Sequence, residues 1–159
     1  MKKVLLMAVT GLMIAARAHA ESAHKGWGTV AAEWAGAKSP TPVVHSVGIQ
    51  GPWAPTNKPD PPTNAPLQAG YCFKTSSIVT LQRVYMLVVG EDGTINTREI
   101  KSSKPVVSKN EVTEGYYCAS FSTEKVSFKE GDLFVIVLKA DGQTIPIFLK
   151  MVYNRFVPS

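Results

Sequence analysis

The chain has 159 residues, of which 45% are hydrophobic and 18% charged, and its formal net charge is +5. Three of its 17 basic residues, and none of its 12 acidic residues, lie within the first 20 positions. The remaining 139 residues carry a net charge of only +2 and are about the length of one ordinary domain. This charge is too small to indicate a nucleic-acid-binding protein, which usually needs a concentrated basic stripe.

The first 20 residues have the three parts of a secretory signal peptide. Lys2 and Lys3 form a cationic start, 4–16 is an apolar run, and Ala18-His19-Ala20 is a small-x-small cleavage site. The apolar run is too short to span a membrane, and no later stretch is long enough. No cysteine lies near the cleavage site to accept a lipid. We therefore expect export, to the periplasm or the medium, with no transmembrane anchor after cleavage.

Residues 21–66 are predicted to be an N-terminal arm rich in tryptophan and proline. They contain eight of the eleven prolines and all three tryptophans, Trp27, Trp34 and Trp53. Within the arm, 29–37 is compatible with a short helix and 43–49 with a strand. Residues 51–66 hold so many prolines that we expect an extended connection that forms neither helix nor central strand.

Residues 67–159 are predicted to be a β-domain that begins with a hairpin. In 78–89, the side chains of Val79, Leu81, Tyr85, Leu87 and Val89 share one face at period two, interrupted by Arg83. Glu91-Asp92-Gly93 then supplies a turn, because Asp-Gly tolerates the positive φ angles of hairpin turns. The return strand, 94–101, is polar on both faces, as expected of an edge strand protected by charge.

The C-terminal part predicts a second hairpin. Residues 133–138 are apolar on both faces, which is typical of a central strand, and Ala140-Asp141-Gly142 follows as a turn. Residues 144–153 have an apolar side chain at every second position, which predicts a strand. Proline has no amide to donate, so Pro146 requires that one side of this strand lacks a neighbouring strand near its start. With no helix of normal length expected in 67–159, the sequence predicts an all-β fold, an antiparallel β-sandwich or a small barrel.

Cys72 and Cys118 are predicted to form a disulfide, because an exported chain matures in an oxidising compartment. Aromatic residues flank both cysteines, and neither His24 nor His45 has a metal-ligand spacing to them. The string Tyr116-Tyr117-Cys118 is similar to the Tyr-x-Cys segment of immunoglobulin variable domains. No tryptophan lies between the two cysteines, so this likeness implies a sandwich that is immunoglobulin-like only in the broad sense.

The sequence offers no constellation for catalysis, and we expect no enzymatic activity, cofactor or metal. None of the common nucleophile, zinc-protease, phosphate-loop or dinucleotide motifs is present. Glu91, Asp92, Asp132 and Asp141 all fall at predicted turns, where such side chains bind local backbone amides. His45 is the one weak catalytic candidate, and a hydrolase with an unfamiliar site is the remaining enzymatic alternative.

Two groups of residues are candidates for binding. The tryptophans either cap the core or offer flat surfaces to sugars or extended peptides. The basic residues of the polar edge either stay solvated or meet an acidic partner: Arg98, Lys101, Lys104 and Lys109. The leading hypothesis is a non-enzymatic domain that binds a protein partner in the cell envelope or outside the cell, as an accessory subunit, an inhibitor or an immunity factor. The alternative is a carbohydrate- or small-ligand-binding module that uses the tryptophans.

Overall fold

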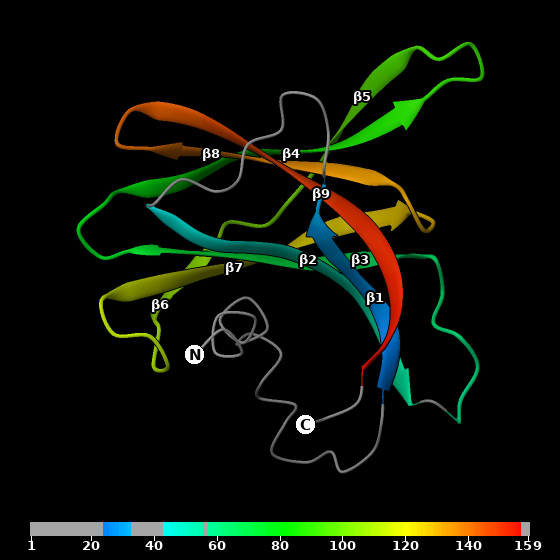
Figure 1. Cartoon of the computed structure of the whole chain (residues 1–159), viewed down its shortest axis with the longest axis horizontal. Coiled ribbons are helices and arrows are strands. Elements are labelled where there is room, and N and C mark those ends of the chain that lie inside the picture. The colour runs from blue at the N-terminus through cyan, green and yellow to red at the C-terminus, as the bar shows by residue number, and fades with distance from the viewer. Residues whose placement is uncertain (1–23, 33–42, 56, 157–159) are drawn as a thin grey trace.

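The computed structural model describes residues 24–32, 43–55 and 57–156, and these residues contain strands and turns but no helix. The strands form a single antiparallel sheet in the order β5-β4-β8-β9-β1-β2-β3-β7-β6 (Figure 1). In chain order they are β1 (His24–Ala31), β2 (Val44–Pro55), β3 (Asn64–Lys74), β4 (Val79–Val89), β5 (Ile95–Ile100), β6 (Val106–Lys109), β7 (Tyr116–Ser127), β8 (Leu133–Ala140) and β9 (Gln143–Phe156). The predicted all-β antiparallel fold is confirmed.

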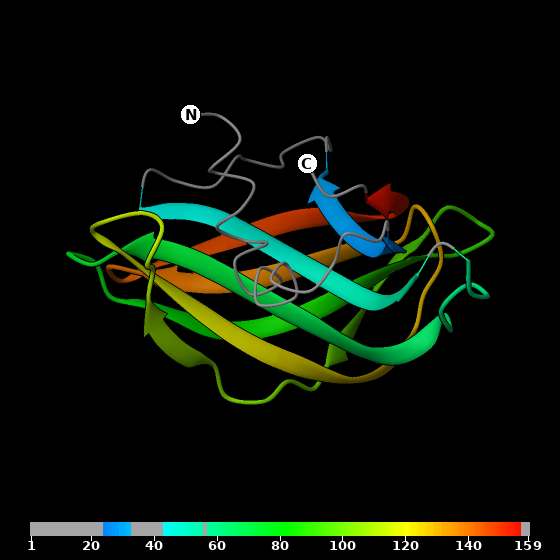
Figure 2. The same cartoon turned by 90° about the horizontal axis from the view of Figure 1, so that it is seen from below.

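The sheet curls so that its two halves face each other around one core. Figure 2 shows β2, β3 and β7 lying across β9, β8 and β4. Both halves contribute fully buried side chains to the core, including Leu67 and Tyr71 from β3 and Phe134, Ile136 and Leu138 from β8. Each such side chain stabilises the fold by about 1.5–3 kcal/mol relative to exposure.

The two ends of the sheet are connected by the residues that follow β5. Ser102 forms an isolated antiparallel bridge with Thr123 of β7. The Ser103 amide donates to the Ser122 carbonyl at 2.8 Å, and the Glu124 amide donates to the Lys101 carbonyl at 2.9 Å. β5 therefore pairs with β4 at one end of the sheet. The residues that follow it, 101–103 and then β6, pair with β7 at the other end. Both edge strands of the open sheet belong to one stretch, residues 95–109.

Both predicted hairpin turns are confirmed. Gly93 has a φ of 81°, and the Asp92 carboxylate accepts a hydrogen bond from the Thr94 amide at 3.0 Å. In the second turn, Asp141 and Gly142 have φ angles of 49° and 84°, the two positive values that a type I′ turn requires. β8 lies between β4 and β9 and is buried from both faces, as predicted for 133–138.

The predicted single face of β4 is wrong beyond Leu81. The pairing with β8 shifts by one residue between Leu81 and Arg83, which is the signature of a β-bulge. Val84 and Met86 consequently face the core, whereas Arg83 points away from it. The bulge moves a charged side chain out of the apolar face, which explains the interruption seen in the sequence pattern.

The region predicted as an arm supplies strands to the middle of the sheet. β1 lies between β9 and β2, so Thr29–Ala31 end a strand instead of beginning a short helix. The predicted boundary at residue 67 falls inside β3. Residues 51–55 also belong to a strand, and proline is tolerated there because β3 pairs only with the earlier part of β2. The predicted signal peptide and 33–37 lie outside the described residues.

Candidate functional site

Three of the predicted basic residues lie along one exposed stretch that ends in the edge strand β6. Lys101, Lys104 and Lys109 are all exposed, and no acidic residue occurs between the first and the last of them. We call residues 101–109 the basic stretch. Within the described part of the chain, the ion pairs are Lys25 with Asp60 and Arg83 with Glu99, so none of the three lysines is paired with a carboxylate. Three free cations on one stretch attract anionic groups.

Apolar side chains are exposed within the same stretch. Val106 and Val107 of β6 are 70% and 53% exposed, and Tyr117 on the adjoining strand β7 is 37% exposed. Because successive strand residues point to opposite faces, the two valines put apolar surface on both sides of the edge. The basic stretch therefore combines positive charge with apolar side chains that the described residues leave exposed to solvent.

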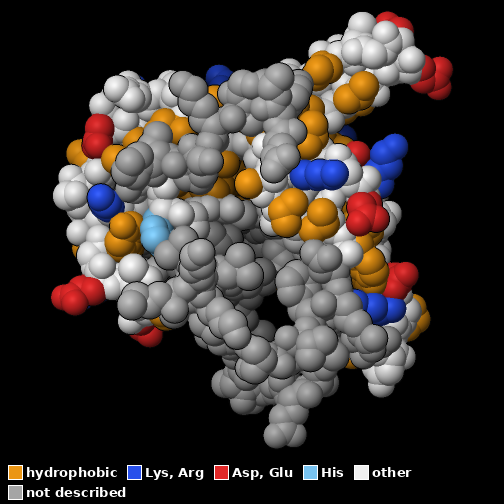
Figure 3. Space-filling view, in the orientation of Figure 1, with side chains coloured by type: hydrophobic (Ala, Val, Ile, Leu, Met, Phe, Trp, Pro, Cys, Tyr) orange, Lys and Arg blue, Asp and Glu red, His pale blue; other side chains and the backbone are white. Residues whose placement is uncertain are grey.

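Arg98 lies apart from the lysines, in the hairpin of β4 and β5. Its Cα pairs with that of Met86, and its side chain is exposed. The hairpin projects from the body of the molecule, with hydrophobic side chains along it and acidic side chains at its end (Figures 1 and 3). Val88, Val89 and Ile95 of this hairpin are 44%, 63% and 50% exposed.

The predicted tryptophans do not form one binding surface in the described residues. Trp27 is only 9% exposed and packs in the core, edge-on to Phe128 at 5.2 Å and tilted against Tyr153 at 4.8 Å between ring centroids. A ring buried to this extent offers no face to a sugar. Trp53 is half-buried against the backbone of Gly26, and Trp34 lies outside the described residues.

A polar cluster that sequence analysis missed fastens the connection between β2 and β3. The Asp60 carboxylate accepts a hydrogen bond from the Tyr153 hydroxyl at 2.7 Å and forms an ion pair with Lys25. These two donors, Lys25 first, hold the pKa of Asp60 below its ordinary value. Desolvation and, to a lesser extent, the Asp60 carboxylate raise the pKa of Tyr153 to about 12. The cluster ties the loop to β1 and β9, which is a structural role.

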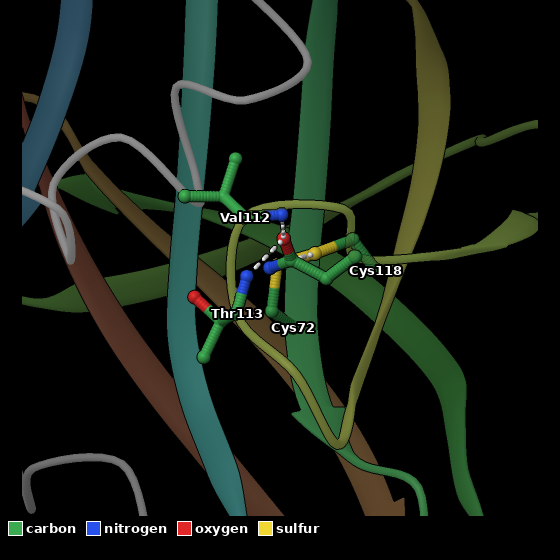
Figure 4. Close-up of a disulfide and its surroundings, with 5 residues drawn as sticks. Cys72, Val112, Thr113 and Cys118 are labelled. Carbon is green, nitrogen blue, oxygen red and sulfur yellow. Dashed lines mark hydrogen bonds between the residues drawn. A yellow bond between two sulfur atoms is a disulfide. The ribbon is translucent and has the colours of Figure 1, made fainter.

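The predicted disulfide is present and joins residues that pair directly across β3 and β7. Cys72 is 1% exposed, and its Cα lies 4.1 Å from that of Cys118. The buried Asn110 side chain covers the bond: its Nδ2 donates to the Cys118 Sγ at 3.3 Å, and its Oδ1 accepts from the amides of Val112 and Thr113 (Figure 4). The disulfide thereby also organises the turn that links β6 to β7.

Three of the four acidic residues predicted at turns, Asp92, Asp132 and Asp141, accept hydrogen bonds from backbone amides. Asp132 accepts a hydrogen bond from the Lys129 amide at 2.8 Å, and Asp141 accepts one from the Ile78 amide at 3.3 Å. His45 packs against the Tyr116 ring at a centroid distance of 4.6 Å. Over the described ranges, no group of three or more histidine, cysteine or acidic side chains is arranged to hold a metal ion.

Comparison with known proteins places the chain in no family, because no family model, curated protein or solved structure matches it. No helix in the described part of the chain is long and apolar enough to cross a membrane. Any functional assignment therefore depends on the geometry of the molecule itself.

Proposed function

We propose that this protein is an exported, non-enzymatic binding domain that engages an acidic protein partner through the basic stretch. The observation that carries the proposal is the combination of three unpaired lysines with two exposed valines on residues 101–109. The disulfide supports export, because such bonds persist in oxidising compartments. An accessory subunit, an inhibitor and an immunity factor are all roles that such a domain can fill.

The position of the stretch favours binding over a purely structural role. β6 ends the sheet and pairs only with β7 within the described residues, so no neighbouring strand covers the side chains of the basic stretch, and a partner can reach them. The chain after the predicted cleavage site is close to neutral overall, so the three lysines stand out as a local charge. Surface cations of this kind mainly steer a partner of opposite charge, and their effect weakens with added salt.

The test is charge reversal on the mature protein with a matched control. The test variant carries Lys101→Glu, Lys104→Glu and Lys109→Glu. The control carries the same charge change at three exposed lysines outside the stretch, Lys129, Lys139 and Lys150. Both variants and the unaltered protein serve as bait for crosslinking and affinity isolation from envelope extracts.

We expect one reproducible partner with the unaltered protein and the control, and its loss with the test variant. Recovery should also fall as salt is added during isolation. A partner that binds all three baits equally would refute the role of the basic stretch. The absence of any reproducible partner under several crosslinking conditions would refute the proposed function itself.

A further inference from the structure

The two edges of the sheet differ in how well they are protected against pairing. β6 has only four residues, follows Lys104 and Pro105 directly and ends at Lys109. Short length, proline and lysine are the usual devices that keep an edge strand from pairing with another chain. β5 has six residues and contains neither proline nor lysine. β6 is therefore protected against pairing with another strand, whereas the only charged residues of β5 are Arg98 and Glu99, and Glu99 is already paired with Arg83.

The hydrogen-bond pattern of the hairpin shows which backbone groups of β5 are free. The Gly90 amide donates to the Thr94 carbonyl at 2.7 Å, which makes this pair hydrogen-bonded. Because hydrogen-bonded pairs alternate along an antiparallel ladder, Asn96 and Arg98 point their backbone groups at β4. Ile95, Thr97 and Glu99 then direct their amides and carbonyls away from β4. No backbone hydrogen bond to these three residues occurs elsewhere in the described chain.

This edge is complementary to itself in one register. If two β5 strands run antiparallel with Thr97 opposite Thr97, then Ile95 of each copy lies opposite Glu99 of the other. All outward-facing residues are used in this register, and three pairs that each exchange two bonds give about six hydrogen bonds. Thr–Thr pairs are favourable across strands. Each Glu99 keeps its own Arg83, which donates to its Oε2 at 2.7 Å.

We propose that a second copy of this chain pairs with β5 about a two-fold axis at Thr97, so that the sheet continues through the dimer. The projecting hairpin brings this edge clear of the body (Figure 1), and pairing would cover part of the exposed surface of Ile95. The equivalent two-fold pairing of two β6 strands at Val107 would place Lys109 of each copy opposite Pro105 of the other, and proline has no amide to donate to that pair. The dimer does not rest on the proposed function, because its backbone pairs use Ile95, Thr97 and Glu99 and none of the residues of the basic stretch.

Sedimentation equilibrium of the full mature chain over a wide concentration range tests the proposal. Thr97→Pro removes two of the about six bonds from the dimer but none from the β4–β5 ladder, so the dimer should weaken at least about tenfold. Thr97→Val keeps the amide and should leave the dimer intact. The Asn110 amide donates to the Tyr116 carbonyl at 2.9 Å, so by alternation the Val107 amide points away from β7. Val107→Pro removes this outward amide on β6 and should also leave the dimer intact. The melting temperature of each variant reports whether it is folded.

A covalent readout does not depend on the proline variant. Thr97→Cys places two thiols across the two-fold axis, so mild oxidation should give a crosslinked dimer, whereas Ser108→Cys on β6 should not. A chain that is monomeric at every concentration overturns the proposal. So does a dimer that persists in Thr97→Pro, or one that is lost in Val107→Pro.

Discussion

Removal of the disulfide is the most quantitative test of how this fold is stabilised. The bond closes a loop between residues 46 positions apart, and the chain-entropy relation gives about 4 kcal/mol for a loop of this length. We therefore expect Cys72→Ala/Cys118→Ala to lower the free energy of unfolding by about 4 kcal/mol. For a chain of this size the melting temperature should fall by roughly 10–20 °C.

Urea unfolding of this variant and of the unaltered protein measures both the midpoint and the slope of the transition. If the bond acts by restricting the unfolded chain, its removal should lower the midpoint and raise the slope, because the unfolded state expands. Reduction of the unaltered protein should reproduce the shift, and the reducing agent should not affect the variant. A midpoint that is the same with and without the bond would refute this account of stability.

Two further predictions concern the packing around Trp27 and the polar cluster. Gly51→Ala should destabilise by about 1–3 kcal/mol in urea unfolding, because the new Cβ would lie 2.8 Å from that of Trp27 and 3.1 Å from the Phe128 ring. An unchanged midpoint would contradict the packing. The pKa of the Tyr153 hydroxyl is raised to about 12 in the folded protein, above its ordinary value near 10. The hydroxyl therefore contributes fully to the stability of the fold below pH 10, and this contribution is lost as the pH rises towards 12. Tyr153→Phe should make the free energy of unfolding fall less between pH 10 and 12 than it does in the unaltered protein. If both proteins lose the same stability over this pH range, the proposed role of Tyr153 is refuted.

Local signals in the sequence predicted most of the C-terminal half of the fold. Asp-Gly pairs mark both hairpins because few other residues adopt the φ angles that those turns need. The alternation of β9 is also local, and its predicted apolar face, from Ile145 to Tyr153, faces the core. The disulfide could be inferred from compartment and composition, because only two cysteines were available to pair.

Long-range packing decided what the sequence did not predict. Val30, Ala31 and Trp34 have the spacing of a helix face, yet β1 is a strand because it is paired on both sides, by β9 and β2. Gly51 permits the entry of the Trp27 ring, and that requirement is visible only once both strands are placed. Local propensity is a weak prior that such tertiary contacts override.

In the candidate site, too, local sequence predicted some features and long-range packing decided the others. The sequence placed Lys101, Lys104 and Lys109 together with Arg98 on one polar edge. The lysines are exposed, but Lys109 lies on β6 and Arg98 on β5, at opposite ends of the sheet. The contact between Tyr153 and Asp60 joins residues 93 positions apart, and no pattern in the sequence links them. The self-complementary register of β5 depends on which amides face outward, and this is fixed only by the ladder with β4.

Proline placement connects these observations. In the sequence, the density of proline before residue 67 indicated an N-terminal arm that contains an extended connection over 51–66. In the structure, prolines occupy positions where one side of a strand is unpaired: Pro66 lies beyond the β2–β3 ladder, and Pro146 precedes the residues of β9 that pair with β1. Pro105 extends this pattern to the entry of β6. β5, at the opposite end of the same sheet, contains no proline, and this difference between the two edges is the reason for proposing β5 as the one that pairs with a second copy.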